Sequence, residues 1–207
     1  DWIMDIVKGA NLMARTTSKV EFLTGCYDKM PNGVLARLVV EKMRDIGAPK
    51  FSDEDYAFAK KMSENWDVEK KMNSLQKSGR PDWQKLRDVD FDDIVRDDYR
   101  AGMVGAGSTD VSDVSWVTPT IEFSTTCMSL GTPGHSWQFT AQTGHSIGHK
   151  GLMFSTKVHA AAGLELLTKP ELMKKVKAEW VERLNGRVYE SPIPKDLKPP
   201  LDQLKDA

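Results

Sequence analysis

The sequence predicts an α/β fold, in which helices flank a β-sheet. Near its start, an amphipathic helical pattern over residues 2–14 leads into residues 19–27, a run rich in β-branched and aromatic side chains that is typical of a strand. Further on, the strand-like run 120–130 precedes the longest helical pattern of the chain, residues 146–167. Because helix and strand patterns follow one another in this way, we expect an α/β domain.

The other elements follow from apolar spacing and from start signals. Residues 34–46 have the apolar stripe of a helix. Ser52 is followed three residues later by Asp55, which resembles a capping box and opens a third helix. Pro170 begins a last helix that runs to about Leu184. The proline-rich tail after it is expected to be extended, with no regular element of its own.

The middle of the chain, residues 64–100, is dominated by charge. Nearly all of residues 90–98 (DFDDIVRDD) are acidic or polar. We interpret this segment as a solvated insertion or loop rather than an acidic metal site, because runs of carboxylates usually face water. The glycine-rich stretch 102–107 (GMVGAG) lacks both the GxGxxG spacing and a preceding strand, so a flexible connector is favoured over a phosphate-binding loop.

Composition excludes some partners. The 207 residues include 29 Lys and Arg against 30 Asp and Glu, which leaves a net charge of −1 and no general attraction to nucleic acid or to a membrane surface. No apolar run approaches the roughly 20 residues that a membrane-spanning helix needs. The two cysteines, Cys26 and Cys127, give little support for a disulfide scaffold, so we expect a cytoplasmic location. The chain begins with Asp1 instead of Met, and we expect it to start within a longer protein.

Three of the four histidines, His135, His145 and His149, lie in the segment 134–150 after a strand-like run. Their number indicates a metal or proton-transfer site. His145 and His149 are four residues apart on a helix, so with His135 they could form an open zinc site, although Ser146 replaces the Glu of an HExxH motif. The alternative is that they are hydrogen-bonded structural groups. His159, within the long helix, is expected to pack against neighbours.

Three sequence blocks, in order, carry a family resemblance. They are GSTDVSDVSW (107–116), LGTPGHSWQ (130–138) and SIGHKGL (146–152). Together they resemble the carboxyl-terminal part of the p-aminobenzoyl-glutamate hydrolases, which are co-catalytic metallopeptidases like the aminoacylases and glutamate carboxypeptidases. The closing SPIPK (191–195) is similar to the end of the same proteins.

The resemblance implies two domains in a complete protein. Residues 1–30 would be the last helix and strand of an inserted α/β dimerisation domain. Residues 31–207 would be the second half of the catalytic domain, with its sheet flanked by helices. A homodimer, or a heterodimer with a related subunit, is implied as well.

The resemblance also implies roles for individual residues. His135 matches a histidine that binds one of two divalent metal ions, zinc or manganese. Asp110 matches an aspartate that shapes the cleft, with a helix cap as the alternative. Ser136, beside that histidine, is expected to contact the substrate or line the cleft, and His149 matches a histidine of the cleft or of a helix start. His145 matches no required position, so the resemblance favours one histidine ligand over three.

In such enzymes two metal ions activate a bridging water and a Glu takes its proton, a step that typically contributes about 10²- to 10⁴-fold. The family supplies these parts from a His-x-Asp segment, a bridging ligand and a Glu-Glu pair in its amino-terminal half. This chain contains neither His-x-Asp nor Glu-Glu. We therefore expect no catalytic residue in this chain, and no activity from the chain alone.

The function implied is that of a metal-dependent amidohydrolase, which cleaves the amide between a p-aminobenzoyl-type acyl group and glutamate or a related amino acid. Its substrate would be a small N-acyl amino acid. One alternative is a relative that acts on other N-acyl amino acids or on auxin-type conjugates. Another is a non-catalytic dimerisation or interaction subunit.

Overall fold

The computed structural model describes residues 2–64, 66–105 and 107–199, which fall into two compact units. The first unit contains residues 2–27 and 190–199, and its one helix is α1 (Trp2–Ala14). The second unit contains the described residues between 28 and 189. The predicted domain boundary after residue 30 stays a prediction.

The predicted α/β fold, with a sheet flanked by helices, is wrong for the part of the chain that the structure describes. The predicted strand at 19–27 is extended but pairs with no described strand. The predicted strand at 120–130 makes one isolated parallel bridge, between Thr120 and Pro31, and the Asn32 amide donates to the Thr120 carbonyl at 2.9 Å. Strand-forming residues build a sheet only where a neighbouring strand supplies hydrogen-bond partners, and these segments have one such contact.

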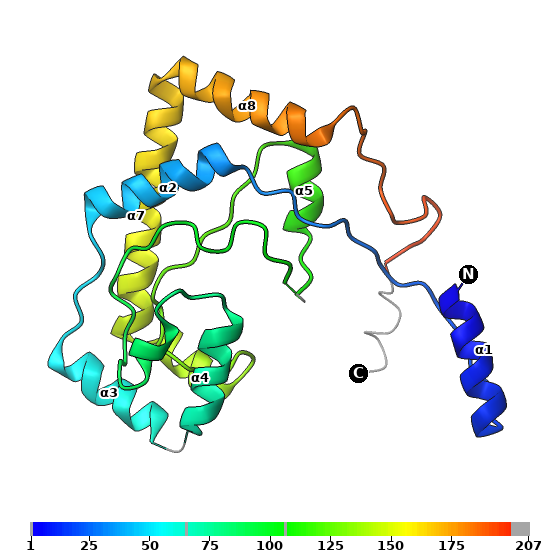
Figure 1. Cartoon of the computed structure of the whole chain (residues 1–207), viewed down its shortest axis with the longest axis horizontal. Helices are drawn as coiled ribbons and strands as arrows, with labels where there is room; N and C mark the ends of the chain where they lie inside the picture. The colour runs from blue at the N-terminus through cyan, green and yellow to red at the C-terminus, as the bar shows by residue number, and fades with distance from the viewer. Residues whose placement is uncertain (1, 65, 106, 200–207) are drawn as a thin grey trace. The chain divides into compact units, whose positions relative to one another are not determined.

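The second unit is helical, and Figure 1 labels most of its elements. The predicted helices at 34–46, 146–167 and 170–184 are confirmed, as are the one at 2–14 in the first unit and the one that Ser52 opens. No helix among the described residues is both long and apolar enough to cross a membrane. The elements of the second unit are α2 (Gly33–Ile46), α3 (Asp53–Ser63), α4 (Val68–Lys77), the 3-10 helix η1 (Trp83–Leu86), α5 (Val111–Val117), α6 (Trp137–Thr143), α7 (Ser146–Thr168) and α8 (Pro170–Leu184).

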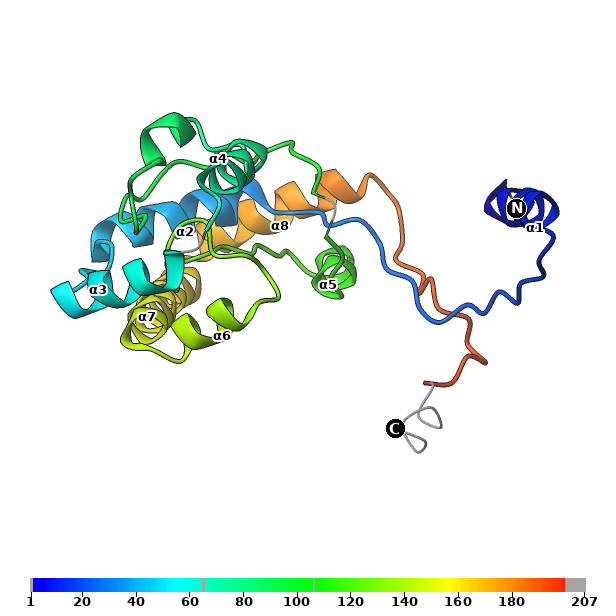
Figure 2. The ribbon, with the colours of Figure 1, turned by 90° about the horizontal axis from the view of Figure 1, so that it is seen from below.

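The main hydrophobic cluster lies between α2 and α7. Val39 of α2 packs with Phe154 and Val158 of α7, and the partly buried Ile121 and Phe123 pack against the same cluster. The extended segment at 120–130 is therefore held to the helices by side chains rather than by a sheet. Helix α8 follows α7 and packs against α2, and Figures 1 and 2 show α2 beside both helices.

The start of α2 is fixed by α8. The Asn32 side chain, which is buried, accepts from the Leu35 amide at 2.9 Å and donates to the Val176 carbonyl at 2.9 Å. The Glu179 carboxylate accepts from the Gly33 and Val34 amides at 2.8 and 2.7 Å. Three amides at the helix start, which have no acceptor within α2, thus receive acceptors from side chains.

The charged middle segment is a loop only in part. Residues 87–100, which include the acidic run, form no helix or strand, as predicted. Residues 68–77 and 83–86 instead form α4 and η1, and Met72, Leu75 and Leu86 build a hydrophobic cluster of their own. Phe91, within the acidic run, is 2% exposed and packs in another cluster with Ala59 and Ile147. A few apolar side chains at suitable spacing are enough to order the segment, although charges surround them in the sequence.

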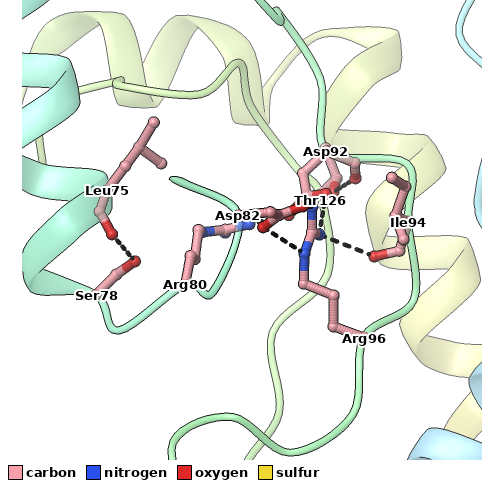
Figure 3. Close-up of polar contacts among 8 residues, drawn as sticks. All are labelled: Leu75, Ser78, Arg80, Asp82, Asp92, Ile94, Arg96 and Thr126. Atoms are coloured by element: carbon pink, nitrogen blue, oxygen red, sulfur yellow. Dashed lines mark hydrogen bonds and ion pairs between the residues drawn. The ribbon is translucent and has the colours of Figure 1, made fainter. Parts of the chain in front are cut away.

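Two arginines pair with one carboxylate of the acidic run, Asp92. Asp92 pairs with Arg80 and with Arg96, and Arg96 also donates to Asp82 at 2.8 Å (Figure 3). Arg96 is 10% exposed and Asp92 is 12% exposed, so these charges lie largely out of water. Thr126, in the extended segment, donates to the Asp92 carbonyl oxygen. The network ties residues 80–96 to the rest of the unit.

Candidate functional site

The loop that carries His135 is held in place by one buried amide. The Gln142 side chain, on α6, is fully buried. Its Oε1 accepts from the backbone amide and the hydroxyl of Ser129 at 2.8 and 2.9 Å, and its Nε2 donates to Thr132 Oγ1 at 2.9 Å. Because both ends of the amide are satisfied, the loop has little freedom to shift.

His135 itself has an unusual backbone conformation. Its φ is +55°, in the left-handed region that residues other than glycine seldom adopt. The next residue, Ser136, caps α6: its Oγ accepts from the Phe139 amide at 3.2 Å and donates to the Pro133 carbonyl at 2.7 Å. Such conformations cost about 1–3 kcal/mol and cluster at functional sites, so the turn is consistent with a site here.

A hollow of about 410 Å³ lies at this turn. It is lined by Gly134, His135, Ser136, Trp137, Phe139 and Thr140. Two of the predicted site residues, His135 and Ser136, are thus brought together. Trp137 and Phe139 were not among the predicted site residues. The signal that could have identified them is their position, two and four residues after His135 at the start of a helix.

The other two predicted cleft residues, Asp110 and His149, do not line this hollow. Asp110 is exposed and precedes α5, but its side chain makes no capping hydrogen bond. The Val111 amide donates instead to Thr109 Oγ1 at 3.3 Å. His149 is exposed in the first turn of α7. The roles assigned to these two residues stay predictions.

The structure does not assemble the three histidines into a metal site. Within the described ranges, no group of three or more His, Cys, Asp or Glu side chains is arranged to hold an ion. The His145 ring stacks on Phe58 with centroids 4.1 Å apart, and its Nδ1 lies 3.2 Å from Ser146 Oγ. The fourth histidine, His159, contacts the Phe123 ring. These observations favour a structural role for His145.

A fully buried carboxylate, Asp55, joins α3 to the start of α7. It completes the predicted capping box with Ser52, which is confirmed, and it also accepts from Ser146 Oγ and Lys150 Nζ. Burial opposes ionisation, but the hydrogen bonds from Lys150, Ser146 and Ser52 outweigh it and hold the pKa of Asp55 well below its usual range. A carboxylate held ionised in this way is suited to binding two helices together, and poorly suited to donating a proton.

Comparison with known proteins gives one informative relative. It is a p-aminobenzoyl-glutamate hydrolase subunit of Escherichia coli (strain K12), which is 30% identical to this chain over 206 residues. The similarity covers 96% of this chain and 43% of the relative, so the chain spans less than half the length of that protein. No family model and no solved structure matches the chain. The relative confirms the resemblance to the carboxyl-terminal part of the p-aminobenzoyl-glutamate hydrolases that the three motif blocks indicate.

Proposed function

We propose that this chain is the carboxyl-terminal part of a hydrolase that cleaves the amide between a p-aminobenzoyl-type acyl group and glutamate or a related amino acid. The observation that carries the proposal is the similarity to a p-aminobenzoyl-glutamate hydrolase subunit across 96% of the chain. The hollow at residues 134–140 supports it, because most of this hollow lies within one of the motif blocks.

We assign His135 the role of a single ligand to a divalent metal ion, zinc or manganese. Imidazole is the commonest protein metal ligand, and the exposed His135 ring lines the hollow. The described residues do not by themselves fit a metal centre, since His135 has no second and third ligand among them. The remaining ligands of the proposed two-metal site, and the general base, must then come from polypeptide outside this chain.

The proposed assembly has more than one chain. The relative is named as a subunit, which supports a heterodimer with a related subunit; a homodimer is the alternative. The nearly balanced charge of the sequence gives no support for a nucleic-acid partner. A cytoplasmic location is part of the same proposal.

The test of the metal role is His135→Ala in the complete natural protein, purified with any subunit that accompanies it. We expect bound metal to fall from about two ions per active site and hydrolysis of p-aminobenzoyl-glutamate to fall by at least about 100-fold. His159→Ala is the control, because His159 contacts Phe123 outside the hollow. If His135→Ala keeps wild-type metal content and turnover, His135 is not a ligand.

Assays of hydrolysis and of metal content on the same preparation distinguish two other functions. A relative that prefers other N-acyl amino acids or auxin-type conjugates would hydrolyse those amides faster than p-aminobenzoyl-glutamate. A non-catalytic interaction subunit would contain no divalent metal and would hydrolyse none of the amides. The exposed apolar side chains of α1, including Trp2 and Leu12, are what favours this second candidate.

A further inference from the structure

The hollow beside His135 is bordered by two exposed aromatic side chains, Trp137 and Phe139. Trp137 is 66% exposed and Phe139 is 38% exposed. Within the described ranges, the Trp137 indole makes no hydrogen bond and no ring contact. By contrast, the indole Nε1 atoms of Trp116 and Trp180 donate to backbone carbonyls at 2.8 and 2.9 Å. Those two indoles stabilise the fold through hydrogen bonds, whereas the Trp137 indole is accessible to a ligand.

The two rings are held at defined positions. Trp137 is the first residue of α6, whose start is capped by Ser136 and which also carries the buried Gln142. Gln142 in turn fixes the loop at Ser129 and Thr132. A site on a fixed loop is formed before the ligand arrives, which lowers the entropic cost of binding. The volume of about 410 Å³ is in the range of small-molecule sites.

We propose that Trp137 and Phe139 form the subsite for the aromatic acyl group of the substrate, and so determine specificity. This inference rests on the proposed function. Aromatic rings stack on one another in offset or edge-to-face arrangements, and an indole offers the largest face for such a contact. The relative is named for a substrate with a p-aminobenzoyl group, which is an aromatic ring joined to the scissile amide. Trp137 and His135 line the same hollow, so the acyl ring and the proposed metal ligand would share one site.

The proposed occupant of the hollow is a small aromatic ligand. A second polypeptide could also cover an exposed indole, but it would change binding of every substrate alike. An aromatic subsite changes the preference between substrates that differ in the acyl group alone. The ratio of kcat/KM for two such substrates therefore separates the two possibilities.

The experiment uses the complete natural protein with p-aminobenzoyl-glutamate and the aliphatic N-acetyl-glutamate. We expect Trp137→Leu to lower the ratio of kcat/KM for the aromatic over the aliphatic substrate by about tenfold, because stacking is lost. Trp137→Phe keeps a ring and should keep most of the ratio. Trp2→Leu, which removes an exposed indole in the other unit, should leave the ratio unchanged.

An equal loss for both substrates in Trp137→Leu, or no loss for either, would overturn the inference. If the wild-type protein hydrolyses neither substrate, the proposed function fails. The subsite is then tested separately, by measuring the binding of p-aminobenzoate by calorimetry. Binding that is retained in Trp137→Phe and lost in Trp137→Leu supports it. Binding that is absent from the wild type, or equal in all variants, contradicts it.

Discussion

Asp55 is a fully buried acidic residue of the second unit. Its carboxylate has no exposed surface, and it accepts hydrogen bonds from Ser52, Ser146 and Lys150. A buried charge is expensive unless neighbours compensate for it, and here the compensation comes from both α3 and α7. Asp55 therefore caps α3 and also links α3 to the start of α7.

We expect Asp55→Asn to lower the free energy of unfolding by about 2 kcal/mol or more, because it leaves Lys150 without its anionic partner and weakens the cap of α3. Lys150 is partly exposed, which keeps the cost below that of a fully buried pair. The matched control is Asp53→Asn, since Asp53 is an exposed acid in the same helical turn and should change stability by a few tenths of a kcal/mol, roughly the strength of one charge at a helix start. Urea denaturation at neutral pH measures both.

The stability difference between the wild type and Asp55→Asn depends on pH. The pKa of Asp55 is lower in the folded chain than its ordinary value of 3.8, so its contribution to stability is complete above 3.8 and is lost as the pH falls below that value. The stability difference between wild type and Asp55→Asn should therefore shrink on acidification below pH 3.8. A difference that stays constant or grows there would contradict an ionised Asp55.

At the scale of the elements, α7 and the extended segment at 120–130 approach each other closely at Gly151. A Cβ added at Gly151 would collide with the Thr126 carbonyl and the Cys127 sulfur. Gly163, later in the same helix, has open space at the corresponding position. The absence of a side chain at Gly151 is therefore what lets the segment lie against the helix.

We expect Gly151→Ala to destabilise the second unit by about 1–3 kcal/mol, because the backbone of the extended segment must move to accommodate the methyl group. Gly163→Ala should instead stabilise it by about 0.5–1 kcal/mol, since alanine favours helix and meets no neighbour. Thermal or urea unfolding of both variants gives the comparison. The same sign for both substitutions would mean that the packing of α7 differs from that described.

The elements that the sequence predicts best are those with local signals. Ser52 and Asp55 lie within one turn of each other, and Pro170 marks the start of α8, so these helices are predictable from a few residues. The strand-like run at 120–130 needs a partner strand, which no local pattern reveals. In α4, charged and polar residues outnumber Met72 and Leu75. The composition of the segment therefore does not predict the hydrophobic cluster that these two residues form.

In the candidate site, too, some features were predictable from the sequence and others were not. His135 and Ser136 were accessible through a motif resemblance, and the structure brings them to one hollow. The exposure of Trp137 was not accessible, because an aromatic residue at the start of a helix is as compatible with a core as with a surface. His145 and His149 have the spacing of ligands, but the ring of His145 is directed to Phe58.

On the scale of the whole molecule, the chain supplies one proposed ligand and one proposed subsite. The described residues have one histidine at the hollow and no neighbouring set of ligand side chains. The relative is more than twice as long as the aligned chain, because the similarity covers 43% of it. The proposed chemistry therefore requires polypeptide that this chain does not contain.

We expect the purified 207-residue chain to hydrolyse no p-aminobenzoyl-glutamate and to bind no pair of divalent ions tightly. A single imidazole is a weak ligand on its own, whereas the open catalytic metal sites of proteins use three protein ligands. Release of p-aminobenzoate and metal content after dialysis measure the two properties, with the complete protein assayed in parallel as the positive control. Turnover by the chain in a preparation free of the complete enzyme, abolished by His135→Ala, would show that the missing ligands and base lie within these residues after all.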